Sequence, residues 1–442
     1  MTARIEGAGR LRGVLAVPSD KSISHRAAMF ASIAKGKSTV RNLLLAADTI
    51  STLNAMKLLG AEMQGFGKPI NVPGFGQYYE NYEISGCGLH GLKAPGKEID
   101  CGNSGTTMRL LTGLLAGNPF RTVLTGDESL SKRPMARVIR PLSLMGAKIK
   151  ATVDEKYPPL EIEGGPLKAI EYDMPVASAQ VKSALILAGL YANGKTVIKE
   201  PHPSRDHTEK MLPAMGARLK SENNQITVEG PAAELAAFDI TVPGDFSSAA
   251  FFLVGALITE NSEAHINNVC LNPTRTGLLT VLAAMGARIE VESRREVSGE
   301  PVGDIHVKGA RKLKAVDVDE NLVPLMIDEL PILAIACACA EGRSVIRGAS
   351  ELRVKESDRI KAMASGLNAM GIEVEEFEDG LAITGGELKA ARIHSFGDHR
   401  IAMSFAIAAL AARGVTEIEG SECVSISYPA FFDTLTGLRF NG

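Results

Sequence analysis

The sequence lacks the features that mark several classes of protein. Its 48 basic and 51 acidic residues give a net charge of −3, and it contains neither a block of Lys and Arg nor a basic stripe interleaved with aromatic residues. We therefore expect no nucleic-acid partner. No apolar run approaches the length of a membrane span, and the first residues show no signal-peptide or transit-peptide pattern. These absences predict a cytoplasmic protein without membrane contact.

Cysteine and histidine residues are few and scattered. The six cysteines include no CxxC pair, and the eight histidines include no HExxH motif. In a chain of 442 residues we expect such thiols to be reduced and mostly buried, without a disulfide framework. The sequence therefore predicts no metal site.

What the chain does contain is a duplicated start of a helix. At 442 residues it is too long for one hydrophobic core, and two domains are expected. The stretches 17–26 and 242–250 both begin with Val-Pro and continue through an Asp, a helix-start signal, into a run of small residues. They start 225 residues apart, close to half the chain, and only the first carries basic residues. This pattern predicts two similar halves with the charge concentrated in one of them.

Shorter repeats lie within each half. Glycines followed by Ala or Ile recur at spacings of 86, 70, 70 and 85 residues, and they are Gly60, Gly146, Gly216, Gly286 and Gly371. Each is predicted to end a helix in the left-handed conformation before a strand. Other helices start near Ser22, Gly102, Ser178, Phe246, Asp328 and Gly397 and run into Ala, Leu and Ile. Helices that are apolar on all sides are buried, so we predict six α/β units, three in each half.

Cations collect where the first of these helices begins. Lys21 and Arg26 lie in its first two turns with Ser22 and His25, although cations there oppose the helix dipole. This local cost favours an anion-binding site over a merely solvated turn, which remains the simpler interpretation for His25. The segment 102–107 offers backbone N–H groups at another helix start, where an anion site and a plain tight turn are equally supported.

The second half contributes carboxylates. Asp328 and Glu329 follow an apolar run, and one of them is able to accept a proton from a substrate hydroxyl, with helix capping as the alternative role. The segment 351–361 carries seven charges, and a helix through it would align Lys355 with Arg359 beside Glu356. Alone, such a segment is more typical of a solvated helix.

Taken in order, five motifs resemble those of the enolpyruvyl transferases, most closely the branch of the EPSP synthases. They are Asp20-Lys-Ser, Gly102-Asn-Ser-Gly-Thr, Lys132-Arg-Pro-Met, Arg353-Val-Lys-Glu-Ser-Asp-Arg359 and Gly397-Asp-His-Arg400. The segments 178–183 and 205–209 are similar to the bacterial class II branch. The resemblance extends from Val17 to about Phe432, and therefore over nearly the whole chain.

The resemblance implies a fold and a domain organisation. The fold is α/β, with two similar inside-out domains, each of three repeats with buried parallel helices. One discontinuous domain, 1–20 plus 243–442, would carry the catalytic acid and base and the phosphoenolpyruvate side. The other, 21–242, would carry the shikimate 3-phosphate side, with hinges near 18–21 and 242–245. Domain closure would exclude water and bring residues of both domains to one substrate.

The resemblance also implies a reaction. The enolpyruvyl group of phosphoenolpyruvate would pass to the 5-hydroxyl of shikimate 3-phosphate through a tetrahedral ketal, with release of phosphate, on the shikimate pathway to chorismate and the aromatic amino acids. No metal or organic cofactor is implied, and we expect a monomer.

The residues that match the family's motifs fall into three groups. Those expected to bind shikimate 3-phosphate are Lys21, Ser22, Arg26, Ser178, Ala179, Gln180, Arg205, Asp328 and Lys355. Those expected around phosphoenolpyruvate are Lys21, Gly105, Arg133, Gln180, Arg359 and Arg400. Asp328 is expected to act as the base for the hydroxyl and Glu356 as the acid that protonates the methylene, with Lys21 assisting both.

At two positions the sequence differs from the family's first branch, the one that is not class II. Ile426 stands where that branch has a lysine, and Glu351 replaces an asparagine common there, so details of substrate binding differ. The nearest alternative is UDP-N-acetylglucosamine 1-carboxyvinyltransferase, which has Lys-Asn in place of Lys21-Ser22 and a loop cysteine that is absent from 125–133. A second alternative is an RNA-end cyclase, which would need a basic face, and the net charge of −3 argues against it. A third is an inactive binding protein, which would need neither an acid nor a base, and the presence of Asp328, Glu356 and Lys21 argues against it.

Overall fold

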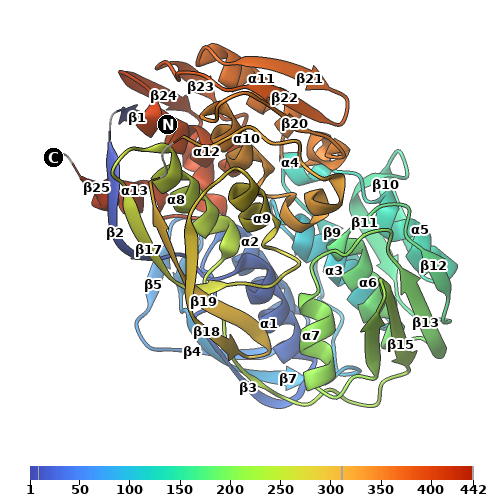
Figure 1. Ribbon diagram of the computed structural model, residues 1–442. Coiled ribbons are helices and arrows are strands. Elements are labelled where there is room, and N and C mark those ends of the chain that lie inside the picture. The colour runs from blue at the N-terminus through green and yellow to red at the C-terminus, as the bar shows by residue number, and fades with distance from the viewer. Residues whose placement is uncertain (8, 310–311, 441–442) are drawn as a thin grey trace. The chain divides into compact units, whose positions relative to one another are not determined.

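The computed structural model describes residues 1–7, 9–309 and 312–440 (Figure 1). Contacts divide the chain into two compact units. The terminal unit comprises Met1–Pro18, Pro243–Glu296 and Pro301–Gly442, and the central unit comprises Ser19–Val242 and Val297–Glu300. The predicted boundary after residue 20 lies two residues beyond this division, and the prediction did not separate Val297–Glu300 from its neighbours. Both main crossings occur at a Val-Pro sequence, at Pro18 and Pro243.

The central unit contains three four-stranded sheets of one construction. In each, a short strand runs parallel to its neighbour and the other two pairings are antiparallel. The first sheet has the order β16 (Asp239–Thr241), β3 (Lys35–Arg41), β7 (Asn81–Cys87) and β4 (Glu62–Phe66). The second has β8 (Ile99–Asp100), β9 (Arg121–Thr125), β11 (Tyr157–Glu163) and β10 (Lys148–Val153). The third has β12 (Glu171–Asp173), β13 (Gly194–Lys199), β15 (Gln225–Gly230) and β14 (Leu219–Glu222). A small hairpin, β5 (Ile70–Val72) and β6 (Gly76–Tyr78), is separate.

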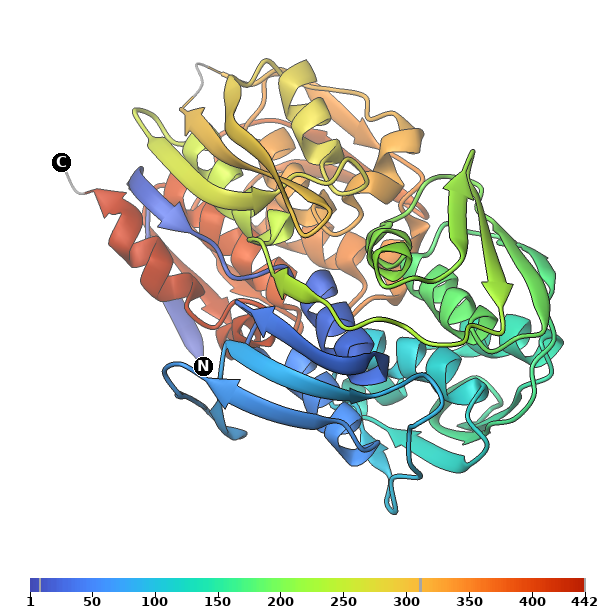
Figure 2. The ribbon, with the colours of Figure 1, turned by 90° about the horizontal axis from the view of Figure 1, so that it is seen from below.

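Two helices accompany each sheet of the central unit. The buried helices are α1 (Lys21–Ile33), α3 (Gly105–Ala116) and α6 (Ala179–Gly189), and the second helices are α2 (Ala47–Leu58), α5 (Ala136–Leu144) and α7 (His207–Ala214). A short helix, α4 (Glu128–Ser131), precedes α5. Figure 2 shows the blue strands of the first sheet over α1, which contacts β3 and β7. Helices α3 and α6 lie side by side because Gly113 leaves room for Ala184: a Cβ at Gly113 would lie 2.2 Å from the Ala184 carbonyl oxygen.

The terminal unit repeats this construction with less regular sheets. The first has the order β18 (Ile289–Val297), β19 (Glu300–Lys308), β17 (Glu263–Cys270), β2 (Arg10–Ala16) and β25 (Arg439–Phe440). The second has β20 (Arg343–Ile346), β22 (Gly380–Thr384) and β21 (Glu373–Phe377). The third has β1 (Thr2–Glu6), β24 (Val415–Glu419) and β23 (Arg392–His394). The buried helices are α8 (Phe246–Ile258), α10 (Leu330–Ala338) and α12 (His399–Ala411). The second helices are α9 (Gly277–Ala284), α11 (Arg359–Ala369) and α13 (Phe431–Leu438), and the 3-10 helices are η1 (Glu320–Met326), η2 (Ser350–Val354) and η3 (Ser421–Ile426).

Each unit is completed by a strand from a distant part of the sequence. Strand β2 precedes the whole central segment, yet it runs parallel to β17, with Arg12 opposite Glu263. Strand β16 is the last of the central segment, yet it runs parallel to β3, with Asp239 opposite Thr39. The discontinuous chain path is therefore built into the sheets themselves.

The predicted repeats are confirmed. The five repeated glycines, from Gly60 to Gly371, have φ between +84° and +106°. Asp20 and Asp245 cap α1 and α8, each accepting a hydrogen bond from a backbone N–H of the first turn. The six buried helices, with sheets whose strands alternate buried and exposed residues, give the predicted inside-out α/β fold.

Other expectations have mixed outcomes. All six cysteines are free thiols and four of them are buried, as predicted. The single helix expected through 351–361 is wrong, because η2 ends at Val354 and α11 begins only at Arg359, capped by Asp358. Among the described residues, no single helix is long and apolar enough to cross a membrane, although the bent pair η1 and α10 passes on length and composition.

Candidate active site

In the central unit, Lys21 is the first residue of α1 and Asp48 faces it from the first turn of α2. Lys21 Nζ lies 3.1 Å from Asp48 Oδ2, and the two side chains are 18% and 8% exposed. The carboxylate offsets the cation that opposes the α1 dipole. Lys21 is thus held at a helix start with part of its surface open to solvent. In sequence, Asp48 resembles any acidic residue in a first helical turn.

Arg26 is buried and joins three segments of the central unit. Its Nε donates to Thr208 Oγ1 at 2.7 Å, its Nη2 to Ser183 Oγ at 2.8 Å, and its Nη1 to the Ser22 carbonyl at 3.0 Å. Arg205 Nη1 lies 3.5 Å from Ser22 Oγ. The predicted residues Ser22, Arg26 and Arg205 are therefore close together, and the guanidinium of Arg26 also ties α1 to α6 and α7.

His25 is buried rather than solvated, which corrects the simpler interpretation of the α1 start. Burial, followed by the charges of Lys21 and Arg26, lowers the pKa of His25 well below its ordinary value, so the ring is neutral. Its Nδ1 lies 2.7 Å from Thr52 Oγ1, which lies 2.7 Å from Thr107 Oγ1. Thr107 Oγ1 donates to Ser104 Oγ at 2.7 Å. This chain of side chains links α1 and α2 to the N-cap of α3.

Gly105 opens helix α3 beside two guanidiniums. Arg109 Nη1 donates to Gln180 Oε1 at 2.6 Å, and Gln180 Nε2 donates to Thr106 Oγ1 at 2.8 Å. A Cβ at Gly105 would lie 2.7 Å from Arg109 Nη1 and 3.5 Å from Arg133 Nη1. Glycine therefore leaves the space that these cations occupy. The prediction missed Arg109, although it lies in the same motif.

Arg133 is fixed by the loop before α3. It is 7% exposed, and its Nη2 donates to Asn103 Oδ1 at 2.6 Å and to Ser129 Oγ at 3.1 Å. Helix α5 begins at Ala136, so Pro134 lies outside it. Arg133 therefore projects from the turn between α4 and α5.

A buried ion cluster supports the segment that carries Arg205. Lys182 Nζ lies 2.8 Å from Glu200 Oε1 and 2.7 Å from Glu209 Oε1, and all three side chains are at most 5% exposed. Lys182 also donates to the Ser204 carbonyl at 3.1 Å. Burial raises the pKa of Glu209, although the Lys182 charge opposes the shift. The cluster holds the 204–208 turn against α6, whose first residues include Gln180.

In the terminal unit, Arg359 is the centre of a carboxylate cluster. It is 1% exposed, and its guanidinium contacts Asp398 Oδ2 at 2.8 Å, Glu356 Oε2 at 2.6 Å and Asp328 Oδ1 at 3.3 Å. Burial alone would lower the pKa of Arg359, but these three negative charges raise it. Conversely, burial would raise the pKa of Asp398, but the Arg359 charge holds it below its ordinary value. Both groups are therefore charged.

Asp328 lies between two guanidiniums. In addition to the contact with Arg359, its Oδ2 is 3.4 Å from Arg400 Nη2, and its carbonyl accepts from Arg400 Nη1 at 3.0 Å. The Asp328 side chain is 15% exposed and that of Glu356 is 19% exposed. Two partly open carboxylates thus share one buried arginine, at the starts of α10, α11 and α12.

Lys355 lies outside any helix, since it follows η2 and precedes α11. Its Nζ contacts Glu351 Oε1 at 2.9 Å. The lysine therefore neighbours Glu356 through the chain, not through a helical turn shared with Arg359.

A second buried network lies next to Asp328, and the sequence did not reveal it. Arg275, 2% exposed, donates to Asp245 Oδ1 at 2.8 Å and to Ser247 Oγ at 2.9 Å. Ser247 Oγ donates in turn to Glu329, which is 1% exposed. Glu329 therefore links the start of α10 to the start of α8 instead of capping its own helix. This fixes the backbone that carries Asp328.

The predicted site residues thus form two groups. In the central unit the structure places Lys21, Ser22, Arg26, Gly105, Arg133, Ser178, Ala179, Gln180 and Arg205 at helix starts or in adjoining turns. In the terminal unit it places Asp328, Lys355, Glu356, Arg359 and Arg400 around the starts of α10, α11 and α12. The first group offers cations and helix N-termini to anions, and the second offers carboxylates between arginines.

Comparisons with known proteins agree on one family. The profile of the family described as EPSP synthase (3-phosphoshikimate 1-carboxyvinyltransferase) matches residues 5–435. A 3-phosphoshikimate 1-carboxyvinyltransferase of Thermodesulfovibrio yellowstonii is 51% identical over 440 residues, covering 99% of this chain and 100% of the relative. That of Geobacter sulfurreducens is 52% identical over 422 residues, 95% of each chain.

A solved structure is similar over the same length. The EPSP synthase of Acinetobacter baumannii is 47% identical in sequence, with a TM-score of 0.86, and the match covers 99% of this chain and 98% of that one.

Proposed function

Because the chain belongs to the EPSP synthase family and transfers the enolpyruvyl group of phosphoenolpyruvate to the 5-hydroxyl of shikimate 3-phosphate, we propose that its two groups of site residues bind and activate these substrates together. The observation that carries the assignment of roles is the cluster in which Asp328 and Glu356 share Arg359, with Arg400 beside Asp328. Carboxylates for proton transfer and arginines for an anion are what this reaction needs in one place.

The central group is proposed to bind shikimate 3-phosphate. Lys21 and Arg205 supply positive charge beside Ser22, and the first turn of α6 supplies Ala179 and Gln180. Backbone N–H groups at both helix starts favour the phosphate. Arg26 and Ser178 complete this group, with Ser178 as the N-cap of α6. From the terminal group, Lys355 and Asp328 are proposed to reach the same substrate.

Phosphoenolpyruvate is proposed to bind among the arginines. Gly105, Arg133, Gln180 and Lys21 contribute from the central group, and Arg359 and Arg400 from the terminal group. Arg359 and Arg400 face Asp328. The anionic substrate would take over part of that charge, so that Asp328 becomes available to the hydroxyl of the acceptor.

Proton transfers then follow from the carboxylates. Asp328 takes the proton of the 5-hydroxyl of shikimate 3-phosphate while the hydroxyl oxygen bonds to C2 of phosphoenolpyruvate. Glu356 gives a proton to the C3 methylene of phosphoenolpyruvate, with Lys21 assisting. The resulting ketal loses a proton from C3 and phosphate from C2, which restores the double bond. No metal or organic cofactor enters this scheme.

The test separates chemistry from binding. In Asp328→Ala, the rate of phosphate release should fall by a factor of about 10²–10⁴, the range for loss of a general base. Calorimetry should still detect binding of shikimate 3-phosphate to this variant. Asp433→Asn, an exposed carboxylate of the same unit, should retain full turnover. Unchanged turnover in Asp328→Ala would refute the role of that residue. UDP-N-acetylglucosamine should not replace shikimate 3-phosphate in the assay.

We further propose that the protein acts as a cytoplasmic monomer. Light scattering during gel filtration should then give a mass near the 46.8 kDa of one chain. A mass of twice that value would contradict the monomer.

A further inference from the structure

Two histidines and a glutamate project from the outward face of the sheet that contains β17 and β19. Along β17, Ala264 and Ile266 are buried, whereas Glu263 and His265 alternate with them and are partly exposed. On β19, His306 lies directly opposite His265 in the antiparallel pairing. Side chains of such a pair, and of residues two positions apart on one strand, share a face of the sheet. The three groups are therefore gathered by strand register.

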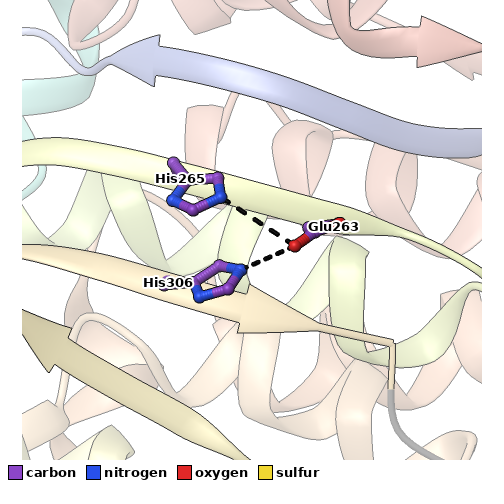
Figure 3. Close-up of side chains that lie close together, drawn as sticks. All are labelled: Glu263, His265 and His306. Carbon is purple, nitrogen blue, oxygen red and sulfur yellow. Dashed lines mark hydrogen bonds and ion pairs between the residues drawn. The ribbon is translucent and has the colours of Figure 1, made fainter.

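The three side chains are close enough to share one ion. His306 Nε2 lies 2.9 Å and His265 Nε2 3.9 Å from the same oxygen, Glu263 Oε1 (Figure 3). One ligand atom from each residue lies within 4.8 Å of the others. The ligand atoms of a tetrahedral zinc ion lie about 3.3 Å apart, given Zn–N and Zn–O distances of about 2.0–2.2 Å. Rotations of the side chains would therefore bring all three to binding distance.

The imidazole rings need only reorient. They are stacked at 3.9 Å between centroids with an angle of 10° between planes. An ion binds in the plane of each ring, so the rings must turn apart about their Cβ–Cγ bonds. His265 is 42% exposed and Glu263 is 34% exposed, and solvent therefore leaves them room to move, while His306, 12% exposed, is the more fixed ligand.

A second carboxylate lies on the far side of His306. Glu290 Oε2, on β18, is 3.6 Å from His306 Nδ1. Histidines that bind metal through one ring nitrogen commonly donate the hydrogen of the other to a carboxylate, which fixes the ring and strengthens the ligand. At 3.6 Å Glu290 does not yet make this hydrogen bond, but its side chain is 73% exposed and has room to move to the shorter distance. It is independent of the three ligands and comes from a third strand.

We propose that Glu263, His265 and His306 form a binding site for a divalent transition-metal ion of the zinc class, with Glu290 as a supporting carboxylate and water in the fourth position. Two imidazoles and a single carboxylate favour Zn²⁺, Ni²⁺ or Cu²⁺ over Mg²⁺ and Ca²⁺, which prefer oxygen ligands. The proposal replaces the sequence-based expectation of no metal. That expectation considered spacing along the chain, whereas His265 and His306 meet only through strand pairing.

Neighbouring cations limit the affinity. Lys308 Nζ lies 3.3 Å from Glu263 Oε1, and Arg12 is opposite Glu263 on β2. The metal must displace these contacts, and we expect a dissociation constant in the micromolar range. The ion would link β17 to β19. Its ligands lie on these strands, whereas Asp328 and Arg400 lie at the starts of helices α10 and α12.

The experiment is calorimetric titration of the full chain, freed of metal by a chelator and dialysis, with Zn²⁺ alone. We expect one Zn²⁺ bound per chain, with affinity reduced at least ten-fold in His265→Ala and in His306→Ala. Glu263→Gln keeps an acceptor for His306 but loses the anionic ligand, and it should also weaken binding. His90→Ala, which removes an exposed histidine of the central unit, is the matched control and should bind as the wild type does.

Two further measurements address folding and identity of the ion. Co²⁺ should give the visible absorption bands of a four-coordinate site in the wild type and not in His306→Ala. Zn²⁺ at 100 times its dissociation constant should raise the melting temperature of the wild type and leave that of the variant unchanged. Millimolar Mg²⁺ should not compete. The proposal is overturned if the wild type binds no Zn²⁺, or if binding persists unchanged in the folded His265→Ala and His306→Ala variants.

Discussion

Replacing Lys182 with methionine removes the only positive charge that contacts Glu200 and Glu209 within the described residues. Lys182 lies 2.8 Å from Glu200 and 2.7 Å from Glu209. Methionine keeps most of the apolar volume of the side chain, so the change isolates the charge from the packing. Because Lys182 also donates to the Ser204 carbonyl, the turn that carries Arg205 loses a contact as well.

The expected loss of stability is large because the cluster is buried. Lys182 is 1% exposed, and Glu200 and Glu209 are 5% and 4% exposed. Removing one partner of a buried ion pair leaves an uncompensated charge and costs about 3–5 kcal/mol. With a slope of about 3 kcal/mol/M in urea, a loss of 3 kcal/mol lowers the midpoint of unfolding by about 1 M.

The loss should also depend on pH. Burial raises the pKa of Glu209, so the folded protein holds this proton more tightly than the unfolded chain. The stability from this proton is present below the unfolded pKa and is lost as pH rises through the folded pKa. Removing Lys182, whose charge opposes the shift, moves the folded pKa of Glu209 further upward. Lys182→Met should therefore be destabilised more at pH 8 than at pH 5.

The assay is urea unfolding followed by circular dichroism at both pH values. Lys148→Met is the control, because Lys148 forms an ion pair with Glu163 in which the side chains are 73% and 63% exposed. It should leave the midpoint essentially unchanged. Adding Glu209→Gln to Lys182→Met should restore part of the lost stability. The reasoning is refuted if Lys182→Met unfolds at the same urea concentration as Lys148→Met.

Two further substitutions test the site directly. Gly105→Ala would place a Cβ 2.7 Å from Arg109 Nη1 and displace that guanidinium from Gln180, which is proposed to bind phosphoenolpyruvate. The KM for phosphoenolpyruvate should rise about ten-fold, since a charge-assisted hydrogen bond contributes about 1.5–3 kcal/mol. Gly165→Ala, whose Cβ would meet no atom within 4 Å, should not change this KM. In Arg359→Lys, the single ammonium cannot reach all three surrounding carboxylates, and kcat should fall at least about 100-fold. Arg343→Lys, in an exposed ion pair, should leave kcat unchanged. Equal kcat values in the two variants would contradict the proposed role of Arg359.

The sequence by itself determined the features that depend on near neighbours in the chain. Helix starts such as Asp20 and Asp245 are local, because the capping side chain bonds to a backbone N–H within three residues. The glycines that end helices are local as well, since a positive φ is a property of one residue. Together with the runs of Ala, Leu and Ile, these signals gave the repeats and the buried helices. The ordered motifs gave the family.

Local patterns also produced the errors. The charges of 351–361 fit a helical spacing, but Asp358 caps a new helix at Arg359 and breaks the pattern. His25 resembled a solvated side chain because its sequence neighbours are polar and charged. The helix that contains it is buried on nearly all sides, so the ring is inside the protein.

Only the tertiary structure decided which side chains meet. Asp48 faces Lys21, Glu329 reaches Ser247, and His265 stacks on His306 across two strands, and none of these pairs has a regular spacing in sequence. The position of a charged or aromatic residue in the sequence does not indicate which residue, tens of positions away, it will contact. That partner is chosen when buried helices and strand registers bring distant segments together, because burial makes an unpaired polar group costly and the packing leaves few partners within reach.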